Sequence, residues 1–536
     1  MSSANGRQDL SALGVQDLSA LGIQALVDPG KTPTDEQVRV IEAPRRPLLV
    51  VAGAGSGKTE TMSMRVLWLV ANHEDIAPSS VLGLTFTRKA AGELGDRLRQ
   101  RLALLAGRVP SLRERLDEDP VSLTYNSFAE RIVAEHGMRI GIDPDFTMLT
   151  EAGAVDLMTQ IVEGWPTDLD EDLSPSAAVG HCLHLAGEVG EHGYTVEEAR
   201  DALEGFGRDL EQIGATNDTA RKTLRANARR LAYLGPVEEF QRRKREGGLL
   251  DFSDQLVLAT RIVREAPAVR AQVRDEFQAV LLDEFQDTSV IQMELLSLLF
   301  HDHAVTAVGD PNQAIYGWRG ASASSLERFL DRFQDGPAQP GQTLTLSTAW
   351  RNDRNILRAA NRVAAPLREH SRAAKSPVLR ARPGAGEGRV DVAYTQDYRS
   401  ALGAVVDFVS AHRARGTREG KRPTTAVLCR RRSDFPYVDM ALREAGVPTQ
   451  IVGLGGLLDQ PSVQDARAAL VLADDVEASP WLARLLAGID LGAADLVALG
   501  DWARHLAREE GRDPHRAVLL DAVDNPPEPG WSASGG

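Results

Sequence analysis

Runs dominated by apolar residues, each bounded by polar positions, divide the first 350 residues of the chain. They span 48–51, 81–86, 279–283 and 304–309. Strands that are buried on both faces of a parallel sheet show such runs, whereas strands with one wet face alternate apolar and polar residues. Helical periodicity follows the first two runs, over 58–72 and from Lys89 onward. This pattern predicts an α/β fold built on a parallel sheet.

The rest of the chain divides into a long helical stretch and a second strand–helix alternation. Residues 105–260 are mostly helical in pattern, with breaks at Pro and Gly. The alternation after residue 343 predicts a second α/β unit. Its expected strands are 344–346, 389–394, 425–429 and 449–452, and its expected helices begin near 353 and span 400–414 and 434–445. Residues 476–536 are again largely helical in pattern.

The N-terminus contains a short repeat. Gln-Asp-Leu-Ser-Ala-Leu-Gly occurs at 8–14 and again at 16–22. Two copies cannot build a solenoid, so we expect a flexible or weakly helical tail over residues 1–31. The ordered chain is expected to begin near residue 32, where Thr34 and Gln37 have the spacing of a capping box.

Length and composition restrict the class of protein. A chain of 536 residues exceeds one core and predicts about three or four domains. No apolar run approaches the roughly 20 residues of a membrane helix, and no secretory signal pattern is present. Cys182 and Cys429 lie far apart in the sequence. We therefore expect a cytoplasmic protein without a membrane partner, a disulfide framework or a zinc site.

The charge pattern leaves two interpretations open. The formal net charge is −15, which argues against a simple nucleic-acid coat protein but does not exclude a local DNA groove. Basic residues gather over 88–101 and 221–245. Each stretch could be a solvated helix face or a nucleic-acid surface.

Residues 52–59, Ala-Gly-Ala-Gly-Ser-Gly-Lys-Thr, have the pattern of a phosphate-binding loop between a strand and a helix. Small residues let backbone N–H groups curl around phosphates at the helix N-terminus. Lys58 would reach the β- and γ-phosphates, and the Thr59 hydroxyl would bind Mg²⁺. Ala52 stands where the strict pattern has Gly, and a Gly-rich turn without a ligand is the alternative.

An acidic pair follows the predicted strand 279–283. An acid at the end of a buried strand can hold Mg²⁺, and the next acid can orient or deprotonate the attacking water. We assign Asp283 to the metal and Glu284 to the base. A capping cluster is the alternative, but together with the phosphate-binding loop the pair indicates hydrolysis of a nucleoside triphosphate.

The segment 308–320 holds two aromatic residues in a Gly-rich loop after a predicted strand. Tyr316 and Trp318 lie two positions apart, next to Arg319. Such residues suit stacking on exposed nucleobases, which is tolerant of base sequence. Core aromatics are the alternative, although aromatic residues make up only 5% of the chain.

Taken in order, these segments resemble the motifs of a superfamily-1A DNA helicase of the UvrD/Rep type. The matching segments are 34–37, 52–59, 85–91, 124–129, 250–256, 283–287, 309–320 and 348–352. Two of them depart from the usual pattern. Tyr125 and Asn126 stand where most members have Phe and His, and Trp350 stands where the family usually has Tyr.

The resemblance implies roles for individual residues. Gln37 would contact adenine, Trp350 would stack on it, and Gln313 and Arg351 would contact the γ-phosphate. The expected catalytic residues are Lys58, Asp283, Glu284, Gln313 and Arg351. The expected ATP contacts are Gln37, Ala52, Gly53, Ala54, Gly55, Ser56, Gly57, Lys58, Thr59, Glu60 and Trp350, with Thr59 and Asp283 on Mg²⁺. The expected DNA contacts are Thr85, Phe86, Arg88, Asn126, Tyr316, Trp318 and Arg319.

The resemblance also implies the architecture and the activity. It implies two RecA-like domains, the second incomplete, and an ATP-dependent 3′–5′ helicase or translocase on single-stranded and duplex DNA, in repair or recombination. The expected parts are the tail 1–31, domain 1A (32–110 and 262–342), the helical insertion 1B (111–261), partial domain 2A (343–475) and the start of a 2B insertion (476–536). The amino-acid sequences of the motifs are most similar to those of AdnA/AdnB-type helicase–nuclease subunits of actinobacteria. This resemblance implies a second motor subunit as partner.

Two family motifs near the C-terminus, including the one that supplies an arginine finger, are not found after Arg351. We therefore expect an N-terminal fragment, and losing an arginine finger typically costs about 10³–10⁵ in rate. The alternative function is a non-catalytic DNA-binding or scaffolding subunit that needs a partner chain for hydrolysis.

Overall fold

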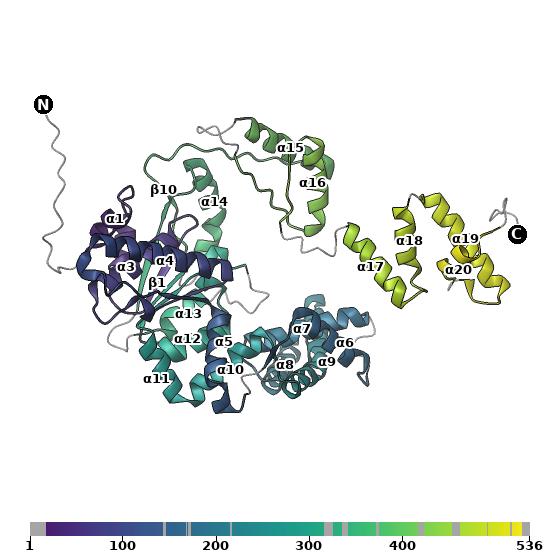
Figure 1. Cartoon of the computed structure of the whole chain (residues 1–536), viewed down its shortest axis with the longest axis horizontal. Coiled ribbons are helices and arrows are strands. Elements are labelled where there is room, and N and C mark those ends of the chain that lie inside the picture. Colours follow the sequence, from purple (N-terminus) through teal and green to yellow (C-terminus); the bar gives the residue numbers. More distant parts are fainter. Residues whose placement is uncertain are drawn as a thin grey trace. The chain divides into compact units, whose positions relative to one another are not determined.

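The computed structural model describes residues 18–142, 146–167, 169, 173–214, 217–315, 325–334, 341–370, 375–415, 423–452, 461–489, 491–514 and 517–527. Backbone contacts divide the chain into two units, residues 1–390 and 391–536. Figure 1 colours both units along the sequence. Each unit has its own fold.

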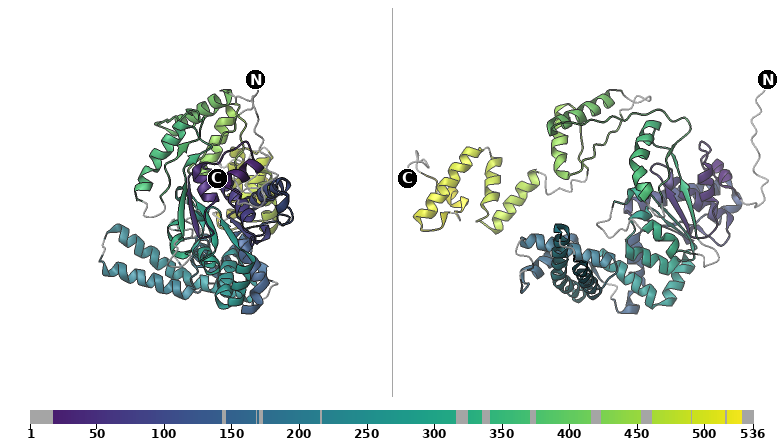
Figure 2. Two further views of the ribbon diagram at one scale, coloured as in Figure 1. Left: turned by 90° about the vertical axis from the view of Figure 1, so that its left-hand side faces the viewer. Right: turned by 180° about the vertical axis from the view of Figure 1, so that it is seen from behind.

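A six-stranded sheet forms the centre of the first unit (Figure 2). The strand order is β3-β2-β6-β7-β1-β8, and every neighbouring pair is parallel. The strands are β1 (Leu48–Ala52), β2 (Val81–Thr85), β3 (Val121–Thr124), β6 (Ala279–Leu282), β7 (Ala304–Gly309) and β8 (Gln342–Leu346). The four predicted apolar runs are β1, β2, β6 and β7, which confirms the α/β fold class.

Both faces of this sheet are covered by helices, which is why β1, β2, β6 and β7 are apolar almost throughout. Successive side chains of a strand point to opposite faces, so Leu49 and Val51 lie in one core while Leu48 and Val50 lie in the other. The first core is completed by α5 (Tyr125–His136), α10 (Phe252–Glu265), α11 (Pro267–Glu276), α12 (Val290–Phe300) and α13 (Ser325–Arg332). The second is completed by α1 (Ala20–Val27), α2 (Asp35–Ile41), α3 (Lys58–Asn72) and α4 (Arg88–Arg108).

Helix α1 corrects the expectation of a tail that extends to residue 31. Ser19 caps it by accepting a hydrogen bond from the Gly22 N–H, and Ala20 and Ile23 are fully buried against the second core. The Leu18 backbone exchanges two hydrogen bonds with the Asn72 side chain on α3. The second copy of the N-terminal repeat therefore contributes to the fold, because Ala20 lies on the buried face of α1 and Leu18 is bound to α3, although Leu21 is exposed.

The segment 111–261, expected to be a helical insertion, divides between two cores. Strand β3 and helices α5 and α10 belong to the sheet and its first core. A separate core lies among α6 (Glu151–Glu163), α7 (Pro175–Glu191), α8 (Val196–Gln212) and α9 (Asp218–Glu246). The short strands β4 (Thr147–Met148) and β5 (Leu249–Leu250) pair at the two ends of this helical group. The separate helical group thus covers fewer residues than the expected range 111–261.

The strand predicted to open the second α/β unit belongs to the first sheet instead. Strand β8 pairs with β1 along its whole length. Directly after it, β9 (Thr348–Ala349) pairs with β10 (Arg380–Ala381), and α14 (Arg354–His370) connects these two strands. The alternating pattern of β8 identified a strand correctly but could not show which sheet it joins.

The second unit is helical in its described part. Helices α15 (Tyr398–Arg415) and α16 (Phe435–Glu444) match the predicted helices and share a small core around Val409 and Leu442. Helices α17 (Pro461–Asp474), α18 (Ser479–Gly488), α19 (Ala493–Glu509) and α20 (Leu519–Asp524) follow. The predicted strands 389–394, 425–429 and 449–452 are not formed in the described residues. β-Branched and other apolar residues suit these segments to a strand, but none of them pairs with a neighbour, and Tyr394 and Leu428 are exposed.

Candidate nucleotide and nucleic-acid site

The loop between β1 and α3 has the geometry of a phosphate cradle. Gly55 and Gly57 have φ of +72° and +82°, values that side chains rarely adopt, and they turn the backbone into the N-terminus of α3. A Cβ on Gly57 would lie 3.0 Å from the Gln37 side-chain nitrogen, so the loop is closely packed. The Ser56 hydroxyl is buried without a hydrogen-bond partner in the described part of the chain. A buried hydroxyl donor in a loop that leads into a helix N-terminus fits an anionic ligand.

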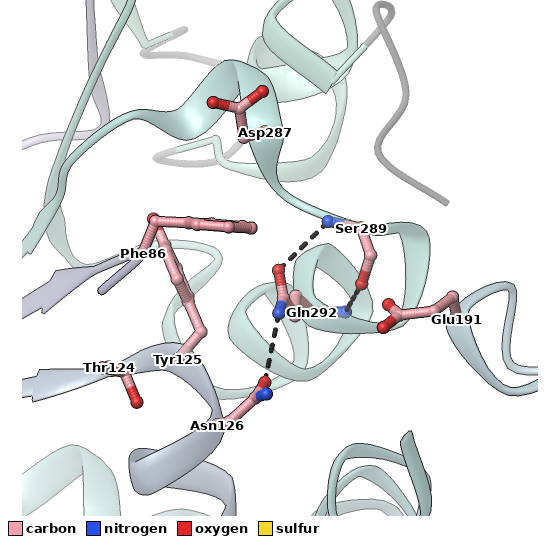
Figure 3. Close-up of a pocket in the computed structure, with 8 residues that line it drawn as sticks. All are labelled: Phe86, Thr124, Tyr125, Asn126, Glu191, Asp287, Ser289 and Gln292. Carbon is pink, nitrogen blue, oxygen red and sulfur yellow. Dashed lines mark hydrogen bonds between the residues drawn. The ribbon is translucent and has the colours of Figure 1, made fainter. Parts of the chain in front are cut away.

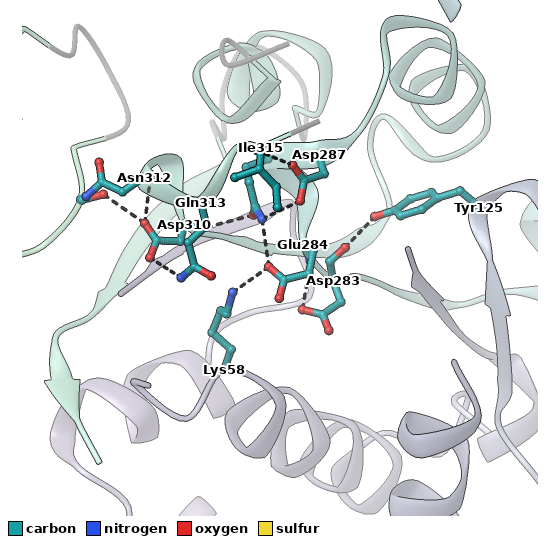
Figure 4. Close-up of polar contacts among 11 residues, drawn as sticks. Lys58, Tyr125, Asp283, Glu284, Asp287, Asp310, Asn312, Gln313 and Ile315 are labelled. Atoms are coloured by element: carbon teal, nitrogen blue, oxygen red, sulfur yellow. Dashed lines mark hydrogen bonds and ion pairs between the residues drawn. The ribbon is translucent and has the colours of Figure 1, made fainter. Parts of the chain in front are cut away.

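Lys58 and Glu284 meet although 226 positions separate them in the sequence. The Lys58 ammonium lies 2.7 Å from the Glu284 Oε2 atom (Figure 4). Glu284 has φ of +48°, and it is the one residue other than glycine with positive φ among those described. Such backbone strain is typical of functional positions, where surrounding contacts must hold it. The two residues assigned to phosphate binding and to the base therefore share one site.

Asp283 is the more deeply buried of the two acids. Burial first, and then the nearby charge of Glu284, raise the pKa of its carboxyl to about 6, while Lys58 opposes the shift. The Tyr125 hydroxyl donates to the Asp283 backbone carbonyl at 3.1 Å. A partly buried carboxylate next to Glu284 and near the charge of Lys58 suits a divalent cation, which would favour its ionised form.

Gln313 belongs to a polar group around the buried Asp310, at the end of β7. The Gln313 amide donates to Asp310 Oδ2 at 2.7 Å, and the Asn312 N–H donates to Asp310 Oδ1 at 3.0 Å. The Ser376 hydroxyl, from the segment before β10, also donates to Oδ1. Ser376 had no sequence signal, because nothing in its local pattern distinguishes it from other loop residues.

The Trp350–Arg351 segment packs directly on the phosphate-binding loop. The Trp350 N–H donates to the Gly55 carbonyl at 2.8 Å, and the Arg351 Cβ would lie 3.0 Å from a Cβ on Gly55. Gln37 approaches the same loop from α2, where the predicted capping box with Thr34 is confirmed. Its amide nitrogen also donates to the Thr61 hydroxyl at 3.2 Å. The structure thus brings the expected adenine contacts to the phosphate-binding loop.

Two other expected contacts have partners within the chain. The Glu60 carboxylate accepts two hydrogen bonds from Arg101 on α4, at 2.6 and 2.7 Å. Thr85 is buried, and its hydroxyl donates to the Thr87 carbonyl. Glu60 and Thr85 therefore contribute at least to the packing of these loops.

A cavity of about 100 Å³ lies next to the acidic loop 283–287 and is lined on one side by Asp287 (Figure 3). Its lining residues are Phe86, Thr124, Tyr125, Asn126, Glu191, Asp287, Ser289 and Gln292. Gln292 connects two walls, since its amide donates to Asn126 Oδ1 at 3.4 Å and accepts from the Ser289 N–H at 3.1 Å. Phe86 and Asn126, two of the expected DNA contacts, therefore face one cavity with an aromatic ring and polar groups, which suits a nucleobase.

The remaining expected DNA contacts differ in placement. Arg88 is the first residue of α4 and is exposed. Tyr316, Trp318 and Arg319 lie outside the described residues. Several basic residues of the two basic stretches have acidic partners, namely Lys89, Arg99, Arg101, Arg242, Arg243 and Lys244. For these side chains the solvated or structural interpretation is the better one.

The comparisons with known proteins agree with this geometry. The model of the UvrD/REP helicase N-terminal domain matches residues 33–334, which is more than half of the chain. The chain belongs to the UvrD/REP helicase family. DNA helicase II of Haemophilus influenzae is 26% identical over 492 residues, 92% of this chain and 60% of that protein.

Two further relatives extend the comparison. DNA helicase II of Escherichia coli is 28% identical over 440 residues, 82% of this chain and 54% of that protein. The ATP-dependent DNA helicase UvrD2 of Mycobacterium tuberculosis is 28% identical over 500 residues, 92% of this chain and 64% of that protein. The chain thus spans between about half and two thirds of the length of these relatives.

The UvrD/REP family implies ATP with a divalent metal, and the residues present fit both. The backbone N–H groups of Gly53 and Ser56 donate to the carbonyls of Leu346 and Gly53. The other N–H groups of the loop, the Ser56 hydroxyl and Lys58 would hold the phosphates, and Thr59 and Asp283 would hold the metal. When bound, the metal would neutralise phosphate charge. Glu284 would lie close to the phosphates, because its Oε2 atom is 2.7 Å from the Lys58 ammonium. None of the helices in the described part of the chain has the length and hydropathy of a membrane-spanning segment.

Proposed function

We propose that this chain is the ATP-binding part of a DNA helicase that uses ATP and Mg²⁺ to move 3′ to 5′ along single-stranded DNA, open duplex DNA, and act in cytoplasmic DNA repair or recombination. The contact between Lys58 and Glu284, 2.7 Å apart at the mouth of the phosphate-binding loop, carries the proposal. Family membership and the cavity around Phe86 support the DNA substrate. The polarity comes from the family resemblance alone.

The proposed chemistry assigns each residue one task. Lys58 binds the β- and γ-phosphates, Gln313 and Arg351 contact the γ-phosphate, and Glu284 orients the attacking water and takes its proton. Gln37 and Trp350 hold the base. Tyr316, Trp318 and Arg319 are proposed, with Phe86, Arg88 and Asn126, to contact single-stranded DNA.

The test is ATP hydrolysis by the 536-residue chain with and without single-stranded DNA, beside the Lys58→Ala variant. We expect hydrolysis that DNA stimulates, and none in the variant, which should still bind a fluorescent oligodeoxythymidine. Undiminished hydrolysis in Lys58→Ala would contradict the assignment of the phosphate-binding loop.

A second candidate is a subunit that needs a partner motor chain, as in the AdnA/AdnB-type enzymes. It is favoured by the three predicted strands 389–394, 425–429 and 449–452, which pair with no neighbour in the described residues. ATP binding without turnover, restored by adding a partner chain, would favour this candidate over the first.

A further inference from the structure

Gln286 lies at the junction between the nucleotide side and the cavity side of the acidic loop. It is 2% exposed and uses all of its hydrogen-bonding groups. Its amide nitrogen donates to Glu284 Oε2 at 3.0 Å and to Asp287 Oδ2 at 3.1 Å. Its amide oxygen accepts from the Asp310 N–H at 3.0 Å. One side chain therefore contacts the proposed base, a cavity residue and the group that holds Gln313.

These contacts define the amide orientation and require glutamine. Two carboxylate acceptors need the two N–H donors, and the Asp310 N–H needs the oxygen, so a flipped amide would face like groups on every side. Glutamate in the same place could not donate, and it would add a third carboxylate. The site is also closely packed, because a Cβ on Gly309 would lie 2.7 Å from the Gln286 oxygen.

Asp287 carries the connection to the cavity. It lines the cavity together with Phe86 and Asn126, and its Oδ1 accepts from the Ile315 N–H at 3.3 Å. Figure 4 shows the polar contacts in sequence from Lys58 through Glu284 to Asp287. A group that enters the cavity would meet Asp287, which shares the Gln286 amide with Glu284.

Lys58 and Gln286 hold the same oxygen of Glu284. The Lys58 ammonium lies 2.7 Å and the Gln286 nitrogen 3.0 Å from Oε2. When Lys58 turns to a phosphate, Gln286 is the remaining side-chain donor to Glu284 in the described structure. The orientation of the Glu284 carboxylate then depends on the Gln286 amide, which is also bonded to Asp287. Because Asp287 lines the cavity, a group bound there could change this orientation.

We propose that Gln286 is a positioning residue that couples occupation of the Phe86 cavity by a nucleobase of single-stranded DNA to the placement of the Glu284 carboxylate. The proposal rests on the proposed function, because it explains how DNA would stimulate hydrolysis. Gln286 touches neither ligand. It acts through Glu284 on one side and Asp287 on the other.

The test compares Gln286→Met with Gln255→Met in the full chain. Methionine keeps the length and apolar bulk of glutamine but cannot donate. Gln255 is a fully buried glutamine on α10 that donates to the Met148 sulfur, so its variant controls for replacing a buried amide. Oligodeoxythymidine affinity, ATP KM, and kcat with and without DNA are measured for both variants and for the unmodified chain.

We expect the ratio of kcat with DNA to kcat without DNA to fall about tenfold or more in Gln286→Met, as for the loss of a hydrogen bond to a charged acceptor. DNA affinity should remain within about twofold, because Gln286 does not line the cavity, and Gln255→Met should keep the ratio. An unchanged ratio in Gln286→Met would overturn the proposal.

A second measurement separates this proposal from the proposed function. If the unmodified chain does not hydrolyse ATP, the proposed catalytic function fails, but coupling can still be read as the change in affinity for a fluorescent ATP analogue when DNA is added. DNA-dependent affinity in the unmodified chain that Gln286→Met loses would support the inference, and binding of both ligands without such coupling would refute it. If Gln286→Met melts early, Gln286→Leu, which also cannot donate and adds no charge, must show the same loss.

Discussion

We predict a large loss of stability when Arg65 on α3, the helix that follows the phosphate-binding loop, is replaced. It is fully buried, and burial lowers the pKa of its guanidinium to about 10. Its Nη1 donates to the carbonyls of Val40, Ile41 and Ala43 at 2.9–3.2 Å. The other two nitrogens donate to the Pro44 carbonyl and to the Thr306 hydroxyl on β7. One guanidinium therefore joins the end of α2, the entry to β1 and the centre of the sheet.

The magnitude follows from the acceptors that Arg65→Met would leave behind. Val40 and Pro44 carbonyls have other backbone donors, whereas the Ile41 and Ala43 carbonyls have no other backbone donor described. At about 1–3 kcal/mol for each buried acceptor left unpaired, two acceptors amount to about 2–6 kcal/mol. Removing a buried charge returns part of this cost. We expect a net loss of about 3 kcal/mol in the free energy of unfolding.

The assay is urea unfolding combined with hydrogen exchange of amides in residues 35–52. Arg45→Met is the matched control, because Arg45 pairs with Asp75 at a largely exposed site, where such pairs contribute about 1 kcal/mol or less. We expect Arg65→Met to increase exchange in this segment and to raise the KM for ATP, since α2 carries Gln37. A loss no greater than that of Arg45→Met would refute the reasoning.

Three further predictions concern other parts of the first unit. The Asp283 carboxyl has a pKa of about 6 in the folded chain against 3.8 for an ordinary aspartate. Without metal, the free energy of unfolding should therefore fall as pH rises from about 4 to about 6. For the same reason, Mg²⁺ affinity should weaken about tenfold per pH unit below 6. Asp283→Asn should remove both effects in denaturation and Mg²⁺ titrations. Ala20→Asp should destabilise the chain by about 3 kcal/mol in urea, because it buries a carboxylate beside Glu42, whereas Leu21→Asp on the exposed face should not. Trp350→Ala should raise the KM for ATP about threefold to tenfold, the value of one aromatic contact, and an unchanged KM would contradict stacking on adenine.

The sequence predicted those parts of the fold in which one local pattern permits one structure. The runs that form β1, β2, β6 and β7 are apolar because helices cover both faces of the sheet. Their apolar pattern was therefore sufficient to predict them as strands. Strand β3, Val-Ser-Leu-Thr, is short and half polar, and only its pairing with β2 identifies it. Helix α1 was missed because a duplicated segment resembles a tail, and its burial depends on Asn72 and Glu42, which lie far along the chain.

The candidate site divides in the same way. Motif residues such as Lys58 and Glu284 could be named from the sequence because their chemistry is tied to local spacing. Gln286 lies inside the same acidic motif, yet its role depends on Asp310, which comes from another strand. Pairing between strands is the information that a single sequence lacks, and it also explains why segment 425–429 could be expected to form a strand that the structure does not contain.

The strand order explains how these distant residues come to share one edge of the sheet. Strands β6, β7 and β1 are consecutive neighbours and parallel, so their carboxyl ends lie side by side. Ligands of open α/β sheets bind at such carboxyl ends. Asp283 and Glu284 follow β6, Asp310 follows β7, and Lys58 follows β1. Strand β7 lies between β6 and β1. The Gln286 side chain, which follows β6, therefore bonds both to Asp310 at the end of β7 and to Glu284, which contacts Lys58. The helical group α6–α9 is inserted between β3 and β6, so the chain can lengthen there without disturbing this edge.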